Sequence, residues 1–441
     1  MSCETSRCNT MDVIVIGAGV IGASVALGLS RKGLRTLNID ALPAAGYGST
    51  SNSSAIIRPF YSALESCALA HEARHRWLNW PQYLKTRDER GYAEYIECGK
   101  LMLLAEGDEK LFQNSVNAMK EVGVAFSHLT ADEVLGRFPA FDMASFGPPK
   151  SPDNPGFGVA NETPLTGGIF ISDAGYVNDP QLATHNLQRT AEALGAVFKF
   201  NTKVVAINRS CDRVTGVTTS MGEEIEASIV VNVAGPHSGV INSLAGIAND
   251  MRVATRPMRH EVAHVPVPAR SVLDHYSCVV GDSDAGVYMR PDIGNSLLIG
   301  SLDPECDTRE YVNADHYNTE LTEQWTCQVW RAAQRLPTLA IPNTARGVVG
   351  LYDATPDWIP IYDKSSLAGF YMAVGTSGNQ FKNAPVIGDL MATLITACEA
   401  GQNHDENPVM FQLPTLNRTI NLGFYTRNRA PHSKTSGTVL A

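Results

Sequence analysis

The sequence predicts an α/β protein with an α+β second domain, in which a nucleotide-binding domain of parallel strands is interleaved with an antiparallel-sheet domain. Three observations predict this architecture. An apolar strand runs into a glycine-rich turn at residues 12–26, and another runs into a small-residue turn at residues 228–235. Residues 251–305 are rich in alternating, strand-like stretches. Because the two kinds of segment alternate along the chain, we expect interleaved domains and not a linear string of them.

The first element is a unit of strand, glycine turn, helix, strand and acid that is typical of dinucleotide binding. Residues 13–16 are the first strand, a helical pattern follows, and residues 36–39 are a second strand that ends on Asp40. The glycines of the turn are Gly17, Gly19 and Gly22. A lone glycine motif is weak evidence, but the complete unit with its acid strongly indicates a nucleotide site.

Each residue of this unit has a physical role in that interpretation. Gly17 allows the tight turn, Gly19 lets the backbone approach a pyrophosphate, and Gly22 lets helix and strand pack closely. The helix N-terminus offers unpaired N–H groups and the positive end of its dipole to the phosphates. Asp40 accepts hydrogen bonds from the ribose hydroxyls and would repel a phosphorylated ribose.

Two other interpretations of this apolar stretch are less consistent with the sequence. Residues 13–29 are about long enough to cross a membrane, but four glycines interrupt them. A secretory signal is disfavoured because Glu4 precedes Arg7 and no clean small-residue cleavage site follows the stretch. We therefore predict a buried strand, and no membrane span.

Composition excludes several classes of protein. The formal net charge of −10 lacks the basic footprint of a nucleic-acid-binding protein. The nine cysteines, including Cys3 and Cys8 near the N-terminus, are scattered and contain no CxxC pair. Neither a disulfide framework nor a zinc site is indicated, so we predict reduced thiols and a cytoplasmic protein.

Periodicity and turn residues predict the remaining elements. Helices are expected at residues 64–80, 108–122, 178–194, 317–336 and 386–397. Strands are expected at residues 100–105, 197–200, 204–209, 214–219 and 369–374. Thr130 and Glu133 form a capping-box pattern. Residues 146–168, with five prolines, are expected to be a long loop, either a lid or a variable surface insertion. The last thirty residues are polar and aperiodic, and we expect them to be loose or surface-bound.

These elements divide the chain into two discontinuous domains and a tail. The predicted nucleotide-binding domain comprises residues 1–95, 169–250 and 356–425. The predicted substrate domain comprises residues 96–168 and 251–355, and residues 426–441 form a C-terminal tail.

Four motifs together resemble the FAD-dependent D-amino-acid-oxidase superfamily, and within it the sarcosine oxidase branch. The resemblance covers about residues 12–398. Its motifs are Gly17-x-Gly19-x-x-Gly22-x-x-x-Ala26, the segment 48–59, the segment 230–238, and the segment 350–358 followed by 375–385. The resemblance implies a Rossmann-type FAD-binding domain, with the flavin ring at the interface with the antiparallel-sheet domain.

The same resemblance implies which residues contact FAD. They are Gly17, Gly19, Gly22, Asp40, Ser49, Thr50, Ser51, Val204, Ala234, Gly235, Gly350, Gly378, Asn379, Gln380, Phe381 and Lys382. Relatives attach the flavin through a cysteine at the position of Gly350, or through a histidine in the segment 48–54. This chain has neither residue there, so we predict noncovalent FAD.

Four residues are predicted to form the substrate pocket by this resemblance. Arg58 and Lys382 match the two cations that bind the substrate carboxylate, and a guanidinium offers it two parallel donors. Their alternatives are a surface or salt-bridged arginine and an exposed turn lysine. Tyr352 matches a pocket tyrosine, and Tyr288 is a further pocket candidate or an ordinary strand tyrosine.

Other polar residues of the strand-rich region have weaker interpretations. His260 and His264 share one face of a strand, but further metal ligands are not found, so no metal site is predicted. We interpret both histidines as surface or packing residues. Arg259 or Arg290 is a possible partner for a second substrate carboxylate. The position of the lysine that promotes oxygen reactivity in the branch matches Leu298, which favours an acceptor other than oxygen.

The leading hypothesis is FAD-dependent oxidation of a small amino acid, most simply a secondary amine such as an N-substituted glycine or a cyclic imino acid. Hydride would pass to the flavin N5, water would hydrolyse the imine, and O2 or another acceptor would take the electrons. The expected partners are this small carboxylated amine and the electron acceptor, without nucleic acid, and an oligomer is possible. Alternatives are a primary D-amino acid or glycine oxidase, a dehydrogenase subunit of a larger complex, a flavin-dependent tRNA-modifying enzyme and an NAD-linked enzyme.

Overall fold

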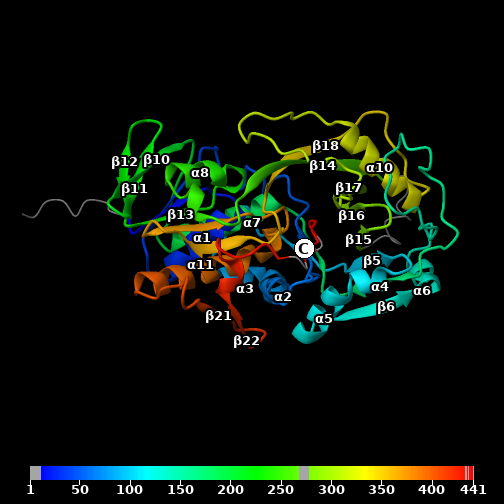
Figure 1. The fold of residues 1–441 in the computed structure, drawn as a ribbon, viewed down its shortest axis with the longest axis horizontal. Coiled ribbons are helices and arrows are strands. Elements are labelled where there is room, and N and C mark those ends of the chain that lie inside the picture. Colours follow the sequence, from blue (N-terminus) through cyan, green and yellow to red (C-terminus); the bar gives the residue numbers. More distant parts are fainter. Residues whose placement is uncertain (1–10, 268–277, 433–434, 436, 441) are drawn as a thin grey trace, which may run out of the picture.

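The computed structural model describes residues 11–267, 278–432, 435 and 437–440. They form two halves that lie side by side in Figure 1, one containing α1, α11 and β13, the other containing α10 and β14–β18. The architecture is a mixed α/β fold with several sheets, which confirms the predicted fold class. Cys3 and Cys8 lie outside the described residues.

The first half is built on a six-stranded sheet, which confirms the expected parallel strands. In spatial order its strands are β19 (Ile361–Lys364), β20 (Phe370–Val374), β13 (Ile229–Asn232), β1 (Val13–Ile16), β2 (Thr36–Ile39) and β9 (Val197–Lys199). Only the β19–β20 pairing within it is antiparallel. Except for the edge strand β9, which is partly exposed, the strands are buried and largely apolar, as expected for a parallel sheet covered on both faces.

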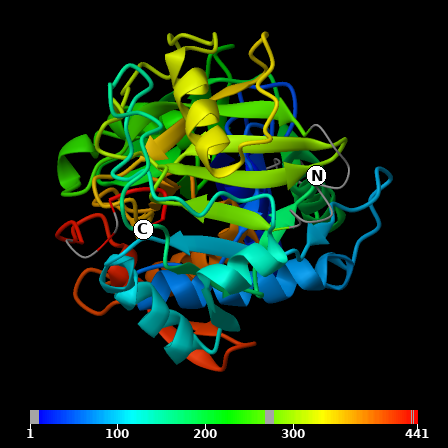
Figure 2. The same ribbon diagram turned by 90° about the vertical axis from the view of Figure 1, so that its right-hand side faces the viewer.

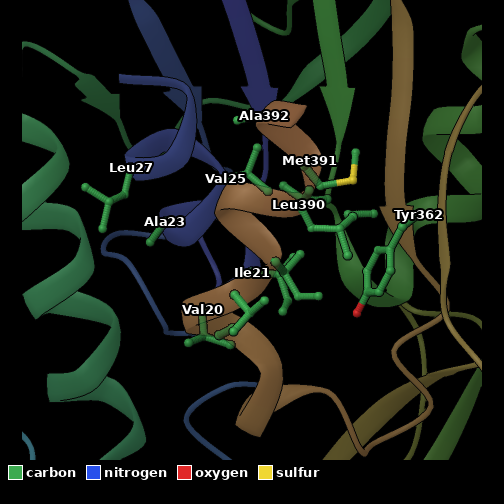
Figure 3. Packing of buried hydrophobic residues seen from close by; sticks show 14 of the residues in the cluster. Val20, Ile21, Ala23, Val25, Leu27, Tyr362, Leu390, Met391 and Ala392 are labelled. Atoms are coloured by element: carbon green, nitrogen blue, oxygen red, sulfur yellow. The ribbon is translucent and has the colours of Figure 1, made fainter. Parts of the chain in front are cut away.

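Two long helices cover one face of this sheet and contact each other closely. They are α1 (Val20–Arg31) and α11 (Ala384–Glu399). A Cβ at Gly28 would lie 2.1 Å from the Gly388 carbonyl oxygen, so glycine at both positions permits the close approach. Figure 3 shows apolar side chains of both helices, including Val25 and Leu390, gathered around this contact. The helix that begins at the glycine turn is therefore held rigidly.

Further helices and small sheets complete this half. The helices are α2 (Leu64–Leu78), α3 (Trp80–Leu84), α7 (Pro180–Ala193) and α8 (Ser238–Leu244), with the 3₁₀ turns η1 (Gly235–His237), η2 (Ala248–Asp250), η3 (Phe381–Asn383) and η4 (Leu422–Tyr425). The small sheets are β10–β11–β12 (Val204–Ser210, Arg213–Thr219, Glu224–Glu226), β3–β8–β4 (Ile56–Ile57, Gly175–Val177, Tyr95–Ile96) and β21–β22 (Met410–Leu413, Arg418–Asn421).

The second half is built on an eight-stranded sheet. In spatial order its strands are β18 (Gly347–Ala354), β14 (Arg256–Pro266), β17 (Ser296–Ser301), β16 (Val287–Asp292), β15 (Val279–Asp282), β5 (Lys100–Leu104), β7 (Gly167–Ile171) and β6 (Phe126–Thr130). All its pairings are antiparallel except β15–β5. The helices of this half are α4 (Asp108–Leu111), α5 (Gln113–Val122), α6 (Ala131–Arg137) and α10 (Glu323–Arg335), and Figure 2 shows α10 lying across the strands. The predicted domain boundary between residues 168 and 169 falls inside β7.

Several predicted elements differ from the structure in extent. The helix predicted at residues 108–122 is two helices, separated at Phe112, whose ring packs 5.4 Å from that of Phe60. The helix predicted from residue 317 begins only at Glu323, because the Asn318 and Glu320 carbonyls accept hydrogen bonds from Arg259. The capping box of α6 is present in both of its hydrogen bonds.

The last thirty residues were expected to be loose or surface-bound, and for the described residues the first of these alternatives is wrong. Arg427 forms ion pairs with Asp250, Asp363 and Asp405, and it is nearly fully buried. Arg429 pairs with Asp357. Each of these ion pairs joins residues that are far apart in the sequence, and the residues around the two arginines show no periodic pattern. The local sequence therefore does not predict them.

No helix among the described residues is both long and apolar enough to pass through a membrane. The predicted long loop at residues 146–168 is confirmed, since it has no helix or strand before β7.

Candidate active site

A cavity of about 640 Å³ runs between the two halves. The glycine turn and Asp40 line one end, which we call the nucleotide end. Arg58, Lys382 and Tyr352 line the other, which we call the substrate end. The cavity thus joins the predicted cofactor residues to the predicted substrate residues.

The nucleotide end is shaped by glycines that leave no room for side chains. Gly17 has φ +114°, and a Cβ there would lie 2.5 Å from the Val233 carbonyl oxygen. A Cβ at Gly22 would lie 2.1 Å from the Gly17 carbonyl oxygen. The backbone of the turn is therefore exposed to the cavity directly before the N-terminus of α1.

Two side chains fix this turn by accepting from its N–H groups. Asp40 Oδ2 accepts from the Ala18 N–H at 2.6 Å, and Thr50 Oγ1 accepts from the Val20 N–H at 3.1 Å. Burial raises the pKa of Asp40, against the opposing effect of hydrogen bonds from Leu42 and Ala18. The turn, its acid and the helix N-terminus form a cradle that fits the pyrophosphate and ribose of a dinucleotide.

Most of the predicted cofactor residues line this one cavity. Those that do are Gly17, Gly19, Asp40, Ser49, Thr50, Val204, Ala234, Gly235, Gly350, Gly378, Gln380, Phe381 and Lys382. Gly22, Ser51 and Asn379 do not line it. Gly22 packs within the turn, and Ser51 is exposed, with its hydroxyl donating to the Gly48 carbonyl.

Arg58 lies at the substrate end, directly after β3, and is 4% exposed. Its guanidinium donates to the Phe60 and Val439 carbonyls and lies 4.5 Å from the centroid of the Tyr61 ring. Within the described part of the chain it has no carboxylate partner. The alternative of a surface arginine is therefore wrong, and no salt bridge is found among the described residues. Burial lowers the pKa of this arginine.

Lys382 lies in η3 and is buried as deeply as Arg58. Its Nζ donates to the Tyr61 hydroxyl at 3.1 Å and to the Asn379 carbonyl. Burial, together with the charges of Arg58 and Lys100, holds the pKa of Lys382 well below its usual range. The alternative of an exposed turn lysine is thus wrong.

Both predicted tyrosines line the substrate end. The Tyr288 hydroxyl is 2.9 Å from Ser54 Oγ, and the Tyr352 ring stacks on His260 with centroids 4.0 Å apart. His260 is buried and lines the cavity, so of its two interpretations the packing residue is correct and the surface residue is wrong. Its Nε2 is 3.5 Å from Asp303 Oδ1, and burial lowers the pKa of His260.

The remaining candidates of the strand-rich region lie outside the cavity lining. Arg259 is paired with Glu261 at 2.8 Å, and Arg290 with Asp292 at 2.7 Å. Both are therefore neutralised by neighbours and unsuited to a second substrate carboxylate. Leu298 is buried in β17 and His264 is half-buried in β14, and neither lines the cavity.

Two features of the substrate end were not predicted from the sequence. Lys100, the first residue of β5, is 2% exposed and lines the cavity beside Arg58 and Lys382. Val439 and Leu440 also line it, and the Gly437 carbonyl accepts from Arg309. We call residues 437–440 the C-terminal strap. A lysine that opens an otherwise apolar strand was the available signal for Lys100.

No metal site was predicted, and the cavity lining gives no reason to add one. Among the described residues, the one group of ligand-type side chains close enough to share an ion is Asp88, Glu89 and His185, which does not line the cavity. Asp88 already accepts hydrogen bonds from Asn186 and the Arg90 N–H.

Comparison with known proteins identifies the cofactor of this site. Residues 12–394 match the family model described as DAO, FAD dependent oxidoreductase. The chain is 22% identical over 427 residues to FAD-dependent oxidoreductase domain-containing protein 1 of Bos taurus, covering 87% of this chain and 81% of that protein. It is 25% identical over 387 residues to sarcosine oxidase subunit beta of Rhodobacter capsulatus, covering 87% and 84%.

A solved structure shows the same fold. L-proline dehydrogenase from P. horikoshii superimposes with a TM-score of 0.74 and 21% identity, covering 95% of this chain and 97% of that one. The match of the family model excludes the alternative of an NAD-linked enzyme and assigns the nucleotide end to FAD. This chain belongs to the DAO family of FAD-dependent oxidoreductases.

Proposed function

We propose that this enzyme oxidises a small amino acid whose nitrogen is a secondary amine, such as an N-substituted glycine or a cyclic imino acid. The observation that carries the proposal is the pair Arg58 and Lys382, buried at the substrate end without a carboxylate partner among the described residues. The names of similar proteins, sarcosine oxidase subunit beta and L-proline dehydrogenase, support a secondary amine as substrate.

Arg58 and Lys382 would bind the substrate carboxylate. A guanidinium gives two parallel hydrogen bonds to a carboxylate, and the ammonium adds a third donor. Because the site is buried, each of these bonds is stronger than in water, and unpaired cations favour an anionic ligand. Together they would fix one end of the substrate and so orient its oxidisable C–H.

Tyr288, Tyr352 and Phe381 would enclose the rest of the substrate. They line the cavity beside the cations and restrict the entry of water. Bound FAD supplies the hydride acceptor for a C–H next to the amine nitrogen. No side chain is assigned as an acid or base, because the neutral amine has the lone pair that assists hydride loss.

FAD is proposed to be dissociable. No cysteine is among the residues that line the cavity in the described chain, and Gly350 occupies the position at which relatives carry the attaching cysteine. Release of the yellow chromophore by denaturation and filtration would support this, and chromophore retained on the polypeptide would refute it.

The proposal is tested by anaerobic reduction of the enzyme-bound flavin. We expect sarcosine or proline to bleach the flavin absorbance, and N-methylethylamine, which lacks the carboxylate, to react at least about 100-fold more slowly. Equal reduction by the two classes would contradict the role of the cations, and reduction by glycine alone would favour a primary-amine oxidase. Readmitting air then distinguishes an oxidase, which reoxidises within seconds, from a dehydrogenase.

A further inference from the structure

Three cations, not two, meet at the substrate end, and they surround one pair of aromatic residues. Lys100 Nζ lies 5.8 Å from the centroid of the Phe60 ring, and the Phe60 carbonyl accepts from Arg58. Arg58 Cζ and Lys382 Nζ lie 4.5 and 5.5 Å from the centroid of the Tyr61 ring. Because Phe60 and Tyr61 are adjacent, the three charged groups form one cluster, which we call the cation cluster.

No described residue neutralises the cluster by an ion pair. Arg58, Lys100 and Lys382 are 4%, 2% and 4% exposed, and none forms an ion pair in the part of the chain that the structure describes. Cations buried in this way are unfavourable unless an anion accompanies them. The pKa of Lys100 is held well below its usual range by burial and by Arg58, which agrees with the absence of a nearby acid.

The carboxylates that line the cavity are committed elsewhere. Asp40 accepts from the Ala18 and Leu42 N–H groups at the nucleotide end. Asp315 lies 2.9 Å from His237 Nε2 and 3.6 Å from Lys203 Nζ. Among the described residues, no carboxylate that lines the cavity is left to compensate the substrate end, so an anionic ligand is favoured there.

One substrate carboxylate accounts for only two of the three cations. Arg58 and Lys382 share Tyr61 and belong to loops of the nucleotide-binding half, whereas Lys100 projects from β5 of the eight-stranded sheet. Arg259 and Arg290, on other strands of this sheet, are paired with acids and lie outside the cavity lining. Among the described strands of the sheet, the cation that lines the cavity is therefore Lys100.

We propose that the substrate is an amino dicarboxylate, whose first carboxylate is bound by Arg58 and Lys382 and whose second is bound by the ammonium of Lys100. This inference rests on the proposed function, because it names the substrate class of that same site. The amine and its oxidisable C–H would lie between the two carboxylates.

The test compares matched substrates on the holoenzyme. In the first pair the nitrogen substituent ends in a carboxylate, in iminodiacetate, or in an alkyl group, in N-propylglycine. In the second pair the side chain ends in a carboxylate, in N-methylaspartate, or in an alkyl group, in N-methylnorvaline. We expect the dicarboxylate of at least one pair to have the higher kcat/KM for flavin reduction, by about 10- to 100-fold.

Lys100→Met identifies the residue responsible, with exposed Lys120→Met as the matched control. We expect Lys100→Met to reduce the ratio of dicarboxylate to monocarboxylate kcat/KM by about 10- to 100-fold, and Lys120→Met to leave it unchanged. Equal losses on both substrates would overturn the proposal and indicate that Lys100 acts on the flavin. A ratio near one in the unaltered enzyme would also overturn it.

Binding of inert ligands separates this inference from the proposed function and does not need catalysis. Succinate should perturb the flavin spectrum at a lower concentration than butyrate does. Lys100→Met should remove that difference but still bind flavin, with the absorbance spectrum of the unaltered holoenzyme. If no secondary amine reduces the flavin but succinate still binds through Lys100, the proposed function fails and the dicarboxylate site stands. If sarcosine and N-methylnorvaline are good substrates and succinate binds no better than butyrate, the dicarboxylate site fails alone.

Discussion

At the nucleotide end of the cavity, Asp40 and Thr50 accept hydrogen bonds from the backbone of the glycine turn, whereas at the substrate end Arg58, Lys100 and Lys382 have no carboxylate partner in the described chain. The nucleotide end is shaped by sterics, because a Cβ added at Gly17 or Gly22 would collide with the backbone. The substrate end is shaped by electrostatics, because buried charge there favours an anionic ligand. We therefore expect shape and backbone N–H groups to hold the cofactor, and buried charge to select the substrate.

Replacing Arg58 tests the electrostatic end and should have the largest effect. Arg58→Met keeps the length and burial of the side chain but removes two donors and the charge. We expect kcat/KM for a carboxylated amine to fall about 100- to 1000-fold, or about 3–4 kcal/mol, measured by anaerobic flavin reduction. Exposed Arg90→Met is the control and should leave kcat/KM unchanged. An unaltered kcat/KM in Arg58→Met would end the assignment.

Adding one methyl group tests the steric end. Gly22→Ala would place a Cβ 2.1 Å from the Gly17 carbonyl oxygen and 3.0 Å from Val233 Cγ2. We expect a loss of about 3 kcal/mol in stability or FAD affinity, seen as a lower fraction of FAD retained after gel filtration. Gly136→Ala is the control, since a Cβ there meets nothing within 4 Å, and the helix should become slightly more stable. Full retention of FAD by Gly22→Ala would show that the turn can shift.

The two ends also differ in how far the sequence predicts them. The glycine turn, its helix and Asp40 are contiguous, and each residue type has one local reason to be there, so the cradle could be predicted before the fold was known. The roles of Arg58 and Lys382 were predicted from the family resemblance and not from their spacing in the sequence. Their shared contact with Tyr61 depends on tertiary packing.

The position of Lys100 in the cation cluster and the contacts of the C-terminal strap depend on tertiary packing in the same way. Lys100 reaches the cluster because β5 pairs in parallel with β15, a crossover that no local pattern encodes. Val439 contacts Arg58 across 381 positions of sequence. For His260, alternation places the residue on a face of β14 but does not say that Tyr352 covers it, so the sequence could not decide between a surface and a packing residue.

Raising the pH should weaken the substrate end and leave the nucleotide end unaffected. Burial first, then Arg58 and Lys100, lower the pKa of Lys382, so its ammonium is lost at a lower pH than that of an exposed lysine. Below the lowered pKa the affinity for butyrate should be constant, and above it the affinity should fall by up to about tenfold per pH unit. The Kd of butyrate, followed by flavin absorbance from pH 6.5 to 9.5, checks this.

The matched comparison for this pH effect is FAD itself. Backbone N–H groups do not titrate over this range, so the fraction of FAD retained should stay constant while the Kd of butyrate rises. Lys382→Met should bind butyrate more weakly at pH 6.5 and show a flatter pH profile. A profile as steep as that of the unaltered enzyme would place the titrating group elsewhere.

The smallest expected effect comes from removing the C-terminal strap. The strap satisfies a hydrogen-bond donor at the substrate end, as Asp40 and Thr50 do at the nucleotide end. The Val439 carbonyl accepts one of the donors that Arg58 would give to a carboxylate, so ligand binding must exchange one hydrogen bond for another. A chain that ends at Thr435 frees this donor, and we expect the Kd of butyrate to fall about three- to tenfold. Leu440→Ala is the control, because it removes apolar packing but keeps the Val439 carbonyl. If Leu440→Ala tightens butyrate binding as much as the truncation does, the strap acts by steric blocking and not by competing for Arg58. The donors of Arg58 would then be available to a ligand, in contrast to the N–H groups that Asp40 and Thr50 occupy at the nucleotide end.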